Sequence, residues 1–256
     1  MQSNDLNEQH RYPDPGRPIL RYERTFRQAG LYTHWHEELE LLLVHEGTAR
    51  FRINQRQVPV GPGQLLYVNR RVLHGFAPPQ GVPVRFTALV LRPEAVCHPE
   101  DSLTAEPLQD LWQDASTPYL LLEAGHPAQA DFQALLQPPR QPLLLRSSLL
   151  ALFAHLMERQ PTPMEAAPVR LDGMRRVLDL LLERYDEPWS LEQLAGVAGL
   201  SKGYFCSCFK QVTGMTAVSY LNERRIQQAA WLLRTTTQPI LAVAQACGFD
   251  NASYFI

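Results

Sequence analysis

LEQLAGVAGL at residues 191–200 and ILAVAQACGF at residues 240–249 are two copies of one pattern, separated by forty-nine positions. In each copy a branched residue precedes a small one, and a glycine with a large apolar residue follows. The small residue lets a second helix pack closely, and the glycine allows a sharp turn at positive φ. A small helical bundle can also place one glycine between two helices. Two copies in register instead favour a repeated helix-turn-helix.

Helix signals surround the two copies. An apolar stripe predicts a helix over 171–185, and Ser190 is expected to cap the helix that starts the first copy. Ser201 is expected to cap the second helix of that copy. Thr216 then opens a long helix that reaches Leu233. We therefore expect everything after residue 170 to be helical.

The second helix of the first copy has two contrasting faces. The expected buried face is aromatic and sulfur-bearing: Tyr204, Phe205, Cys208 and Phe209. The expected outward face is small and polar: Lys202, Gly203, Cys206, Ser207 and Lys210. A DNA major groove would meet this outward face. Its short side chains are poor bidentate base readers, so we assign the two lysines to phosphates.

A set of further motifs lies in the same region: Ser201, Tyr204-Phe205, Phe209-Lys210, Gly214-Met215-Thr216, Tyr220, Arg224-Arg225, Ala229, Leu232-Leu233 and the run from Ile240 to Phe255. With these motifs, residues 170–256 resemble the DNA-binding domain of the AraC/XylS family of bacterial transcription regulators. The resemblance implies two helix-turn-helix subdomains joined by a rigid helix over Ala217–Arg234. Their recognition helices would enter successive major grooves of double-stranded DNA, about 34 Å apart.

The resemblance also implies partners and further contacts. Ser201 joins the expected DNA-binding residues, as do Asn251 and Ala252 in the second copy. RNA polymerase is an expected partner if the protein is an activator.

The end of the chain falls inside the second copy. Aligned on the first copy, Phe255 matches Phe205 and Ile256 matches Cys206, so the second recognition helix has about six residues. So short a helix is held only by tertiary packing, and the counterpart of Phe209 is missing. We therefore expect a truncated domain with a frayed C-terminus and a weakened second half-site. A shortened recombinant chain, a fragmentary gene and a natural truncation all fit.

Residues 30–91 contain short alternating runs separated by Gly, Pro and Asn. Examples are Arg50–Ile53, Leu65–Val68 and Val84–Leu91. This pattern is typical of a small antiparallel β-barrel or sandwich.

Histidines and a glutamate stand at a regular spacing in this half. His34, His36 and Glu40 form His-x-His-x-x-x-Glu, and His74 follows about thirty-five residues later. If the segment from His34 is one regular strand, the first three share a face. The pattern resembles cupin sensor domains that precede AraC-type DNA-binding domains. It implies a jelly-roll barrel over residues 20–95 with the four side chains pointing inward.

These four side chains allow three interpretations. They can bind the hydroxyl groups of a small polar effector, with a sugar as the first guess. They can hold Fe, Mn, Ni or Zn, as in cupin enzymes. They can also satisfy one another as a polar cluster at the barrel mouth. We take an effector bound without a metal cofactor as the leading interpretation and keep a metal as the alternative.

Residues 96–159 change to three-and-four spacing, which predicts amphipathic helices. The stripe Leu149, Leu152, Phe153 and Leu156 can either pack on the barrel or pair with a second protomer in a homodimer. Residues 160–169 are proline-rich and predict an interdomain linker. Residues 1–19 are expected to be a flexible polar arm.

Composition excludes several classes of protein. None of the four cysteines stands in a C-x-x-C spacing, so a zinc site or disulfide framework at cysteines is not expected. The chain has no signal-peptide core and no run of eighteen apolar residues, which predicts a cytoplasmic protein without a membrane partner. From residue 170 onward nine basic residues face eight acidic ones, a weaker basic footprint than DNA-binding modules usually carry.

The fold class we expect is α+β and multidomain: a cupin-like barrel with following helices, then an all-α double helix-turn-helix domain. The function we expect is an effector-responsive, sequence-specific transcription regulator. The rival interpretation is a metal-dependent cupin oxygenase or isomerase with a helical appendage. No catalytic base or nucleophile is recognisable beyond the histidines, and an enzyme would leave the doubled helix-turn-helix without a use. We therefore expect a protein that is not an enzyme.

Overall fold

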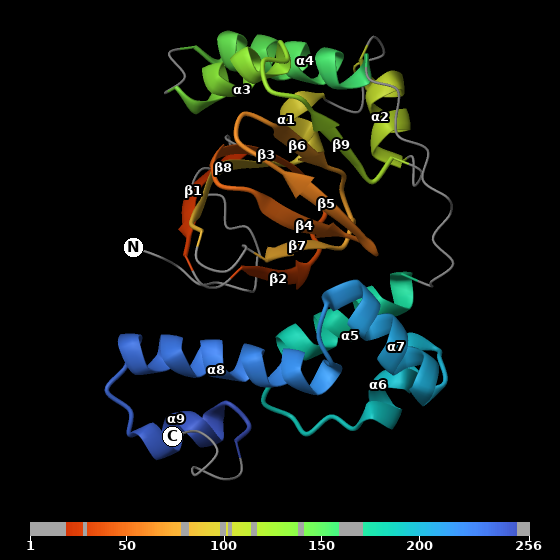
Figure 1. Ribbon diagram of the computed structural model, residues 1–256, viewed down its shortest axis with the longest axis vertical. Helices are drawn as coiled ribbons and strands as arrows, with labels where there is room; N and C mark the ends of the chain where they lie inside the picture. The colour runs from red at the N-terminus through yellow and green to blue at the C-terminus, as the bar shows by residue number, and fades with distance from the viewer. Residues whose placement is uncertain are drawn as a thin grey trace. The chain divides into compact units, whose positions relative to one another are not determined.

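The computed structural model describes residues 19–27, 30–77, 82–97, 101, 104–113, 117–137, 141–158 and 171–249. It divides into two compact units, a sheet-rich unit up to residue 158 and a helical unit from residue 171 (Figure 1). The predicted linker lies outside the described residues, as do residues 250–256 and all of the predicted N-terminal arm except Ile19.

The sheet-rich unit confirms the expected class of a β-domain followed by helices. Its described strands are β1 (Ile19–Phe26), β2 (Leu31–His34), β3 (Leu39–Glu46), β4 (Ala49–Ile53), β5 (Arg56–Val60), β6 (Leu65–Val68), β7 (His74–Ala77), β8 (Val84–Leu91) and β9 (Tyr119–Leu122). Its described helices are α1 (Pro93–Val96), α2 (Ala105–Gln113), α3 (Ala128–Leu136) and α4 (Pro142–Met157).

The strands form two antiparallel sheets, ordered β1-β8-β3-β6-β9 and β2-β7-β4-β5. Strand β9 is a finding that the sequence did not predict, because it lies where helical spacing was expected. It pairs with β6 at the edge of the five-stranded sheet. A short apolar run such as Tyr119–Leu122 cannot be assigned to a strand or a buried helix by periodicity alone.

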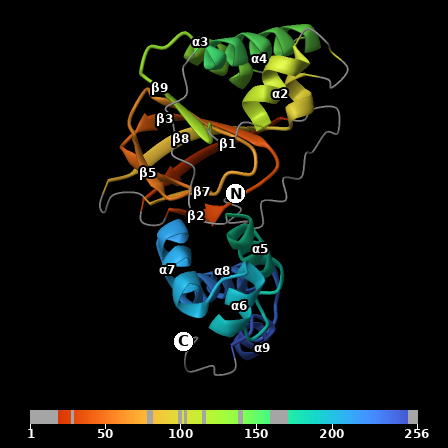
Figure 2. The same cartoon turned by 90° about the vertical axis from the view of Figure 1, so that its right-hand side faces the viewer.

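Successive side chains of β3 point to opposite faces of the five-stranded sheet and so belong to two different hydrophobic cores. Leu41 and Leu43 pack on the face of the five-stranded sheet that the helices cover. Leu42 and Val44 pack between the two sheets. The unit therefore has three layers, with α3 and α4 outside the five-stranded sheet (Figures 1 and 2). By its register in β3, Glu40 shares the face of Leu42 and points between the sheets.

Helix α4 buries the predicted stripe against this sheet. Leu149, Leu152, Phe153 and Leu156 all belong to the helix-covered core. The Phe153 ring meets the Tyr67 ring of β6 edge-on, with 6.0 Å between ring centroids. The stripe thus packs on the sheet of its own chain, which is one of the two expectations.

The helical unit contains α5 (Leu171–Glu183), α6 (Leu191–Ala198), α7 (Lys202–Thr213), α8 (Ala217–Thr235) and α9 (Ile240–Ala246) among its described residues. Helix α8 matches the predicted rod to within one residue, whereas α5 ends two residues earlier than predicted. None of the described helices is long and apolar enough to cross a membrane.

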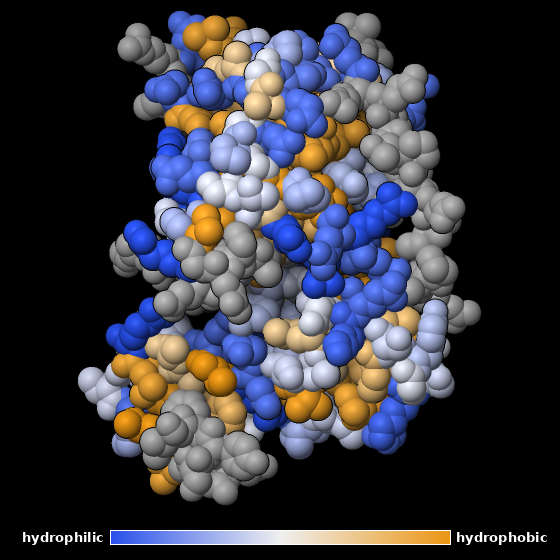
Figure 3. Space-filling view, in the orientation of Figure 1, coloured by the Kyte–Doolittle hydropathy of each residue, from blue (hydrophilic) through white to orange (hydrophobic). Residues whose placement is uncertain are grey.

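Several large apolar side chains of α8 and α9 are exposed among the described residues. Trp231, Leu233, Ile240 and Leu241 of α8 and α9 are between 41% and 57% exposed. Figure 3 shows orange surface around these two helices. Only Val243 and Ala244 of α9 are fully buried among its described residues.

Candidate DNA-binding surface and buried cluster

The two copies have the same backbone geometry at their turns. Gly199 has φ of 70° and Gly248 has φ of 78°, the positive values that the sequence predicted. The amides of Leu200 and Phe249 each donate to the carbonyl five residues earlier, both at 3.0 Å. The forty-nine-residue register is therefore present in the hydrogen bonds as well as in the residue types.

Close main-chain contacts require two glycines, one in α5 beside the first copy and one at the turn of the second copy. A Cβ atom on Gly173 of α5 would lie 2.4 Å from the Ala198 carbonyl oxygen at the end of α6. A Cβ atom on Gly248 would lie equally close to the Asp186 carbonyl oxygen. Leu194 of α6 is buried under this packing. The first helix of each copy is therefore held tightly against its neighbours.

Helix α7 presents most of the expected DNA-binding residues to solvent. Ser201, Lys202, Gly203, Ser207 and Lys210 are exposed, and Cys206 is half-buried. Ser201 occupies the N-cap position, but its side chain makes no capping hydrogen bond. The predicted contacts Asn251 and Ala252 lie outside the described residues.

Tyr204 corrects the predicted buried face of α7. The sequence placed it inside, yet its side chain is 48% exposed. The buried stripe is instead Phe205, Cys208, Phe209 and Val212, which follows the helical spacing of three, four and seven. Tyr204 stands one position before that stripe and so joins the polar surface.

Lys202 has a neighbour that the sequence did not reveal. Its Nζ atom lies 2.6 Å from an Oε1 atom of Glu192 in the first turn of α6. The hydrogen bond to Glu192 raises the pKa of Lys202, which keeps the amine charged. A DNA phosphate would have to compete with Glu192 for this ammonium group.

The buried cluster comprises His34, His36, Glu40 and His74, each with at most 6% of its surface exposed. The expectation of one regular strand is wrong, because the chain leaves strand conformation between β2 and β3. His34 ends β2 in the four-stranded sheet, whereas Glu40 lies in the five-stranded sheet. His34 and His74 are directly opposed on paired strands. Two sheets and a connecting segment thus bring the four residues together.

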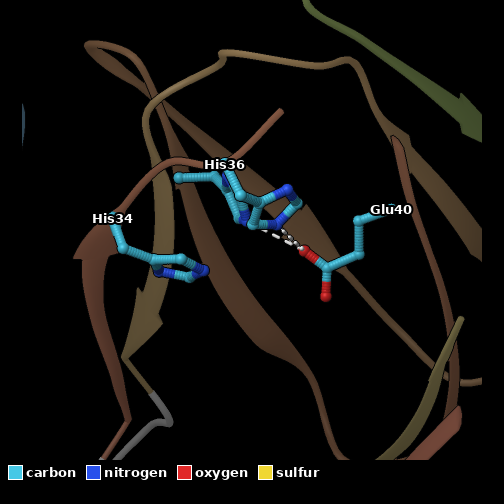
Figure 4. A group of neighbouring side chains, drawn as sticks. His34, His36 and Glu40 are labelled. Carbon is cyan, nitrogen blue, oxygen red and sulfur yellow. Dashed lines mark hydrogen bonds and ion pairs between the residues drawn. The ribbon is translucent and has the colours of Figure 1, made fainter. Parts of the chain in front are cut away.

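Distances in the buried cluster are short. His74 Nε2 lies 2.8 Å from Glu40 Oε2, and His36 Nε2 lies 3.6 Å from the same oxygen. One ligand atom from each of the four residues lies within 4.8 Å of the others. Figure 4 shows the labelled side chains turned toward one space.

Comparison with known proteins assigns both parts of the chain, the sheet-rich unit and the helical unit, to families. A family model described as "AraC-like ligand binding domain" matches residues 18–169, and one described as "Helix-turn-helix domain" matches residues 194–256. The chain belongs to the AraC family of transcription regulators. It is similar to the HTH-type transcriptional regulator YdeC of Bacillus subtilis (strain 168), with 25% identity over 93% of this chain and 86% of YdeC.

Other AraC-type proteins give similar values. The HTH-type transcriptional activator RhaR of Klebsiella pneumoniae is 28% identical over 87% of this chain and 80% of RhaR. The structure of ToxT from Vibrio cholerae aligns with a TM-score of 0.49 and 13% identity, over 93% of this chain and 92% of ToxT. YdeC and RhaR are named as transcription regulators, and this AraC-family chain is a DNA-binding transcription regulator.

The three histidines of this regulator are oriented alike by main-chain carbonyls. The Nδ1 atoms of His34, His36 and His74 lie 2.9, 3.1 and 2.8 Å from the carbonyl oxygens of Tyr32, Glu38 and Val72, respectively. A carbonyl oxygen only accepts, so each Nδ1 carries the hydrogen. In the neutral form of such a ring, the lone pair is on Nε2.

Charge in the buried cluster is set by burial and by these contacts. Burial raises the pKa of Glu40, but hydrogen bonds with His36 and His74 outweigh it, and the pKa lies well below its ordinary value. Burial, with a smaller contribution from His34, lowers the pKa of His74. A neutral His74 would point a lone pair at the Glu40 carboxylate, so a proton or another cation between them would satisfy both atoms.

Gly75 is a positioning residue that sequence reasoning missed. A Cβ atom there would lie 2.7 Å from the Leu31 carbonyl oxygen and 2.8 Å from the Thr33 amide nitrogen of β2. Only glycine allows β2 to approach β7 so closely, which sets His34 beside His74. The signal was present as a glycine inside a strand pattern. The three carbonyl acceptors had no such signal, because every residue carries one.

Proposed function

We propose that this AraC-family regulator binds a small polar effector in its sheet-rich unit and specific double-stranded DNA through α7 and its counterpart in the second copy. The proposal that the helical unit binds DNA is supported by the matched geometry of the two turns, at Gly199 and Gly248. Two equivalent units joined by the single helix α8 suit two neighbouring grooves on one face of a duplex. We expect the protein to act in the cytoplasm, where bacterial DNA lies.

The exposed face of α7 would make the DNA contacts. Lys202 and Lys210 are exposed cations, suited to phosphates. Ser201, Gly203 and Ser207 are small and exposed, and would let the helix approach base edges closely. Direct readout by such short side chains is modest, so DNA shape would contribute to specificity.

The buried cluster would serve the effector. Its four polar side chains are buried between two sheets. The rest of the core between these sheets is apolar and includes Leu42, Val44 and Phe76. A cluster of hydrogen-bonding side chains inside an otherwise apolar sandwich is suited to recognising a polar ligand. A sugar-like molecule with several hydroxyl groups is the first class to screen. The effector would change DNA affinity by binding two arrangements of the protein differently.

One experiment tests both parts. Duplexes are selected from a random-sequence library with the purified chain, and the affinity for the enriched duplex is then measured with and without each of a panel of monosaccharides. We expect one enriched motif and a several-fold affinity change with at least one sugar. The same sugar should have no effect on Glu40→Gln.

Selection without an enriched motif would contradict the DNA proposal. A motif whose affinity changes equally in wild type and Glu40→Gln would contradict the assignment of the effector to the buried cluster. The His45→Gln variant is the matched control, because His45 lies on β3 and contacts Thr87 instead of the cluster.

A further inference from the structure

We propose that a cavity beside α1 and α2 is a second ligand site of the sheet-rich unit and that it binds a small α-amino acid. The cavity has a volume of about 210 Å³ and is lined by residues of α1, of α2 and of the turn after β6. Its buried lining belongs to the helix-covered core, whereas the buried cluster lies between the two sheets. The two sites are therefore separate, and this inference does not rest on the proposed function.

Helix α2 supplies one side of the cavity. Ala105, Gln109, Trp112 and Gln113 all line it, and their spacing of four, seven and eight from Ala105 places them on one side of a helix. Ala105 and Trp112 are buried, Gln109 is half-buried and Gln113 is exposed. Glu94 of α1 is exposed as well. The cavity therefore has a buried floor at Ala105 and Trp112 and an exposed rim at Gln113 and Glu94.

Two hydrogen-bond donors of the lining have no acceptor. Trp112 is 8% exposed, and its Nε1 atom has no hydrogen-bond partner among the described residues. The Nε atom of Arg70, in the turn after β6, is also buried without a partner in this part of the chain. An indole N–H and a guanidinium N–H only donate. Because a buried donor without an acceptor costs free energy, a ligand with acceptor oxygens would bind these two groups favourably.

The Arg70 side chain is already held in position. Its Nη2 atom lies 2.6 Å from Oε2 of Glu37. This ion pair occupies one end of the guanidinium group and leaves Nε for a ligand. A carboxylate has two acceptor oxygens, and a charge-assisted hydrogen bond is roughly twice as strong as a neutral one. The buried part of the cavity is therefore suited to a carboxylate.

The rim favours a positive charge on the same ligand. The Glu94 carboxylate repels a simple organic acid, whereas it attracts a ligand that also carries an ammonium group. The carboxamides of Gln109 and Gln113 can donate to the carboxylate of a ligand or accept from its ammonium group. A carboxylate with a neighbouring ammonium group is the part that all α-amino acids share. The polar lining therefore matches this class better than an acid or an amine alone.

The volume of the cavity limits the side chain of the amino acid. At about 30 Å³ for each water-sized group, the cavity holds roughly seven non-hydrogen atoms. Glycine, alanine, serine and valine are near this size. Phenylalanine and arginine are larger, so we expect them to be excluded.

The test is isothermal titration calorimetry on the full chain with each of these six amino acids. Propionate and ethylamine are the matched probes, because each lacks one of the two charged groups of alanine. We expect one equivalent of at least one small amino acid to bind, and both probes to bind roughly tenfold more weakly or worse. No saturable binding of any small amino acid would overturn the inference. Propionate binding as tight as that of the best amino acid would overturn it too.

Two tryptophan variants assign the ligand to the cavity. Trp112→Phe removes the indole N–H and keeps an aromatic ring beside Phe153, so it should weaken binding roughly tenfold. Trp35→Phe is the matched control and should bind like wild type. The Nε1 atom of Trp35 is also buried without a partner among the described residues, but Trp35 does not line the cavity. Equal affinities of Trp112→Phe and wild type would overturn the site. If Trp112→Phe fails to fold, Ala105→Leu replaces it and should abolish binding by filling the cavity.

A rim variant tests the class of ligand. Glu94→Gln removes an exposed charge and should reduce the preference for alanine over propionate. An unchanged preference would contradict the contact between Glu94 and the ammonium group.

Glu40→Gln separates this inference from the proposed function. This variant should lose the response to sugar and still bind the amino acid like wild type. Loss of amino-acid binding in Glu40→Gln would place the ligand in the buried cluster and overturn the cavity site. A chain that selects a duplex but binds no amino acid overturns the cavity site alone. A chain that binds the amino acid but selects no duplex overturns the proposed function alone.

Discussion

At the residue scale, glycines decide how closely the helices of the DNA-binding unit approach. Gly173 and Gly196 are both inside helices, yet a Cβ atom on Gly173 would lie 2.4 Å from a carbonyl oxygen, and one on Gly196 would meet nothing within 4 Å. We predict that Gly173→Ala lowers the free energy of unfolding by about 1 to 3 kcal/mol, because α5 and α6 must separate.

Gly196→Ala is the matched control and should raise the free energy of unfolding by up to about 1 kcal/mol, since alanine favours the helix. Urea unfolding followed by helical circular dichroism measures both. Equal effects of the two substitutions would show that the contact between α5 and α6 contributes nothing to stability.

For single residues, the sequence predicted the members of the buried cluster correctly but placed Tyr204 on the wrong face of its helix. The types and spacing of His34, His36, Glu40 and His74 predicted a cluster, and the structure brings all four together. Tyr204 was placed on the wrong face, because aromatic character outweighed helical phase in the prediction. The carbonyls that orient the histidines could not be predicted, since side-chain identity carries no information about them.

At the element scale, two serines occupy N-cap positions with different roles. The Ser190 side chain accepts from the Gln193 amide, and Gln193 completes a capping box with the Ser190 amide. Ser201 starts α7 without a side-chain capping bond. We predict that Ser190→Ala lowers the free energy of unfolding by about 1 kcal/mol, because α6 loses its cap.

Ser201→Ala should leave stability within about 0.5 kcal/mol of wild type and weaken DNA binding instead, because Ser201 is proposed to contact DNA. Unfolding curves and duplex affinities of both variants check this. A stability loss for Ser201→Ala as large as that for Ser190→Ala, with unchanged DNA affinity, would contradict the assigned contact.

Elements differ in how far their sequences determine them. Helix α8 could be predicted almost to its last residue, because Thr216 marks its start and no breaker interrupts it. Strand β9 could not, because its identity depends on pairing with β6, which is far away in sequence. The break between β2 and β3 escaped prediction for a similar reason: pairing with different sheets overrides local alternation.

At the scale of the whole molecule, the chain combines an AraC-like ligand-binding unit with a helical unit in which a short helix and its glycine turn occur twice among the described residues. The division into a β-domain and a helical domain followed from the change in hydrophobic period, and the structure confirms this fold class. Effector response requires that the effector and DNA each favour one arrangement of the chain. Such coupling is reciprocal, so DNA would change effector affinity by the same factor.

The central claim is that α7 binds DNA through its exposed polar face. The most direct measurement is the affinity for the selected duplex across a series of salt concentrations, in wild type and in Lys210→Ala. Arg85→Ala is the control, because Arg85 lies on β8 and pairs with Glu46. We predict a linear fall of log affinity with log salt, with a slope about one unit shallower in Lys210→Ala and unchanged in Arg85→Ala. An affinity independent of salt, or a Lys210→Ala slope equal to that of wild type, would contradict this account.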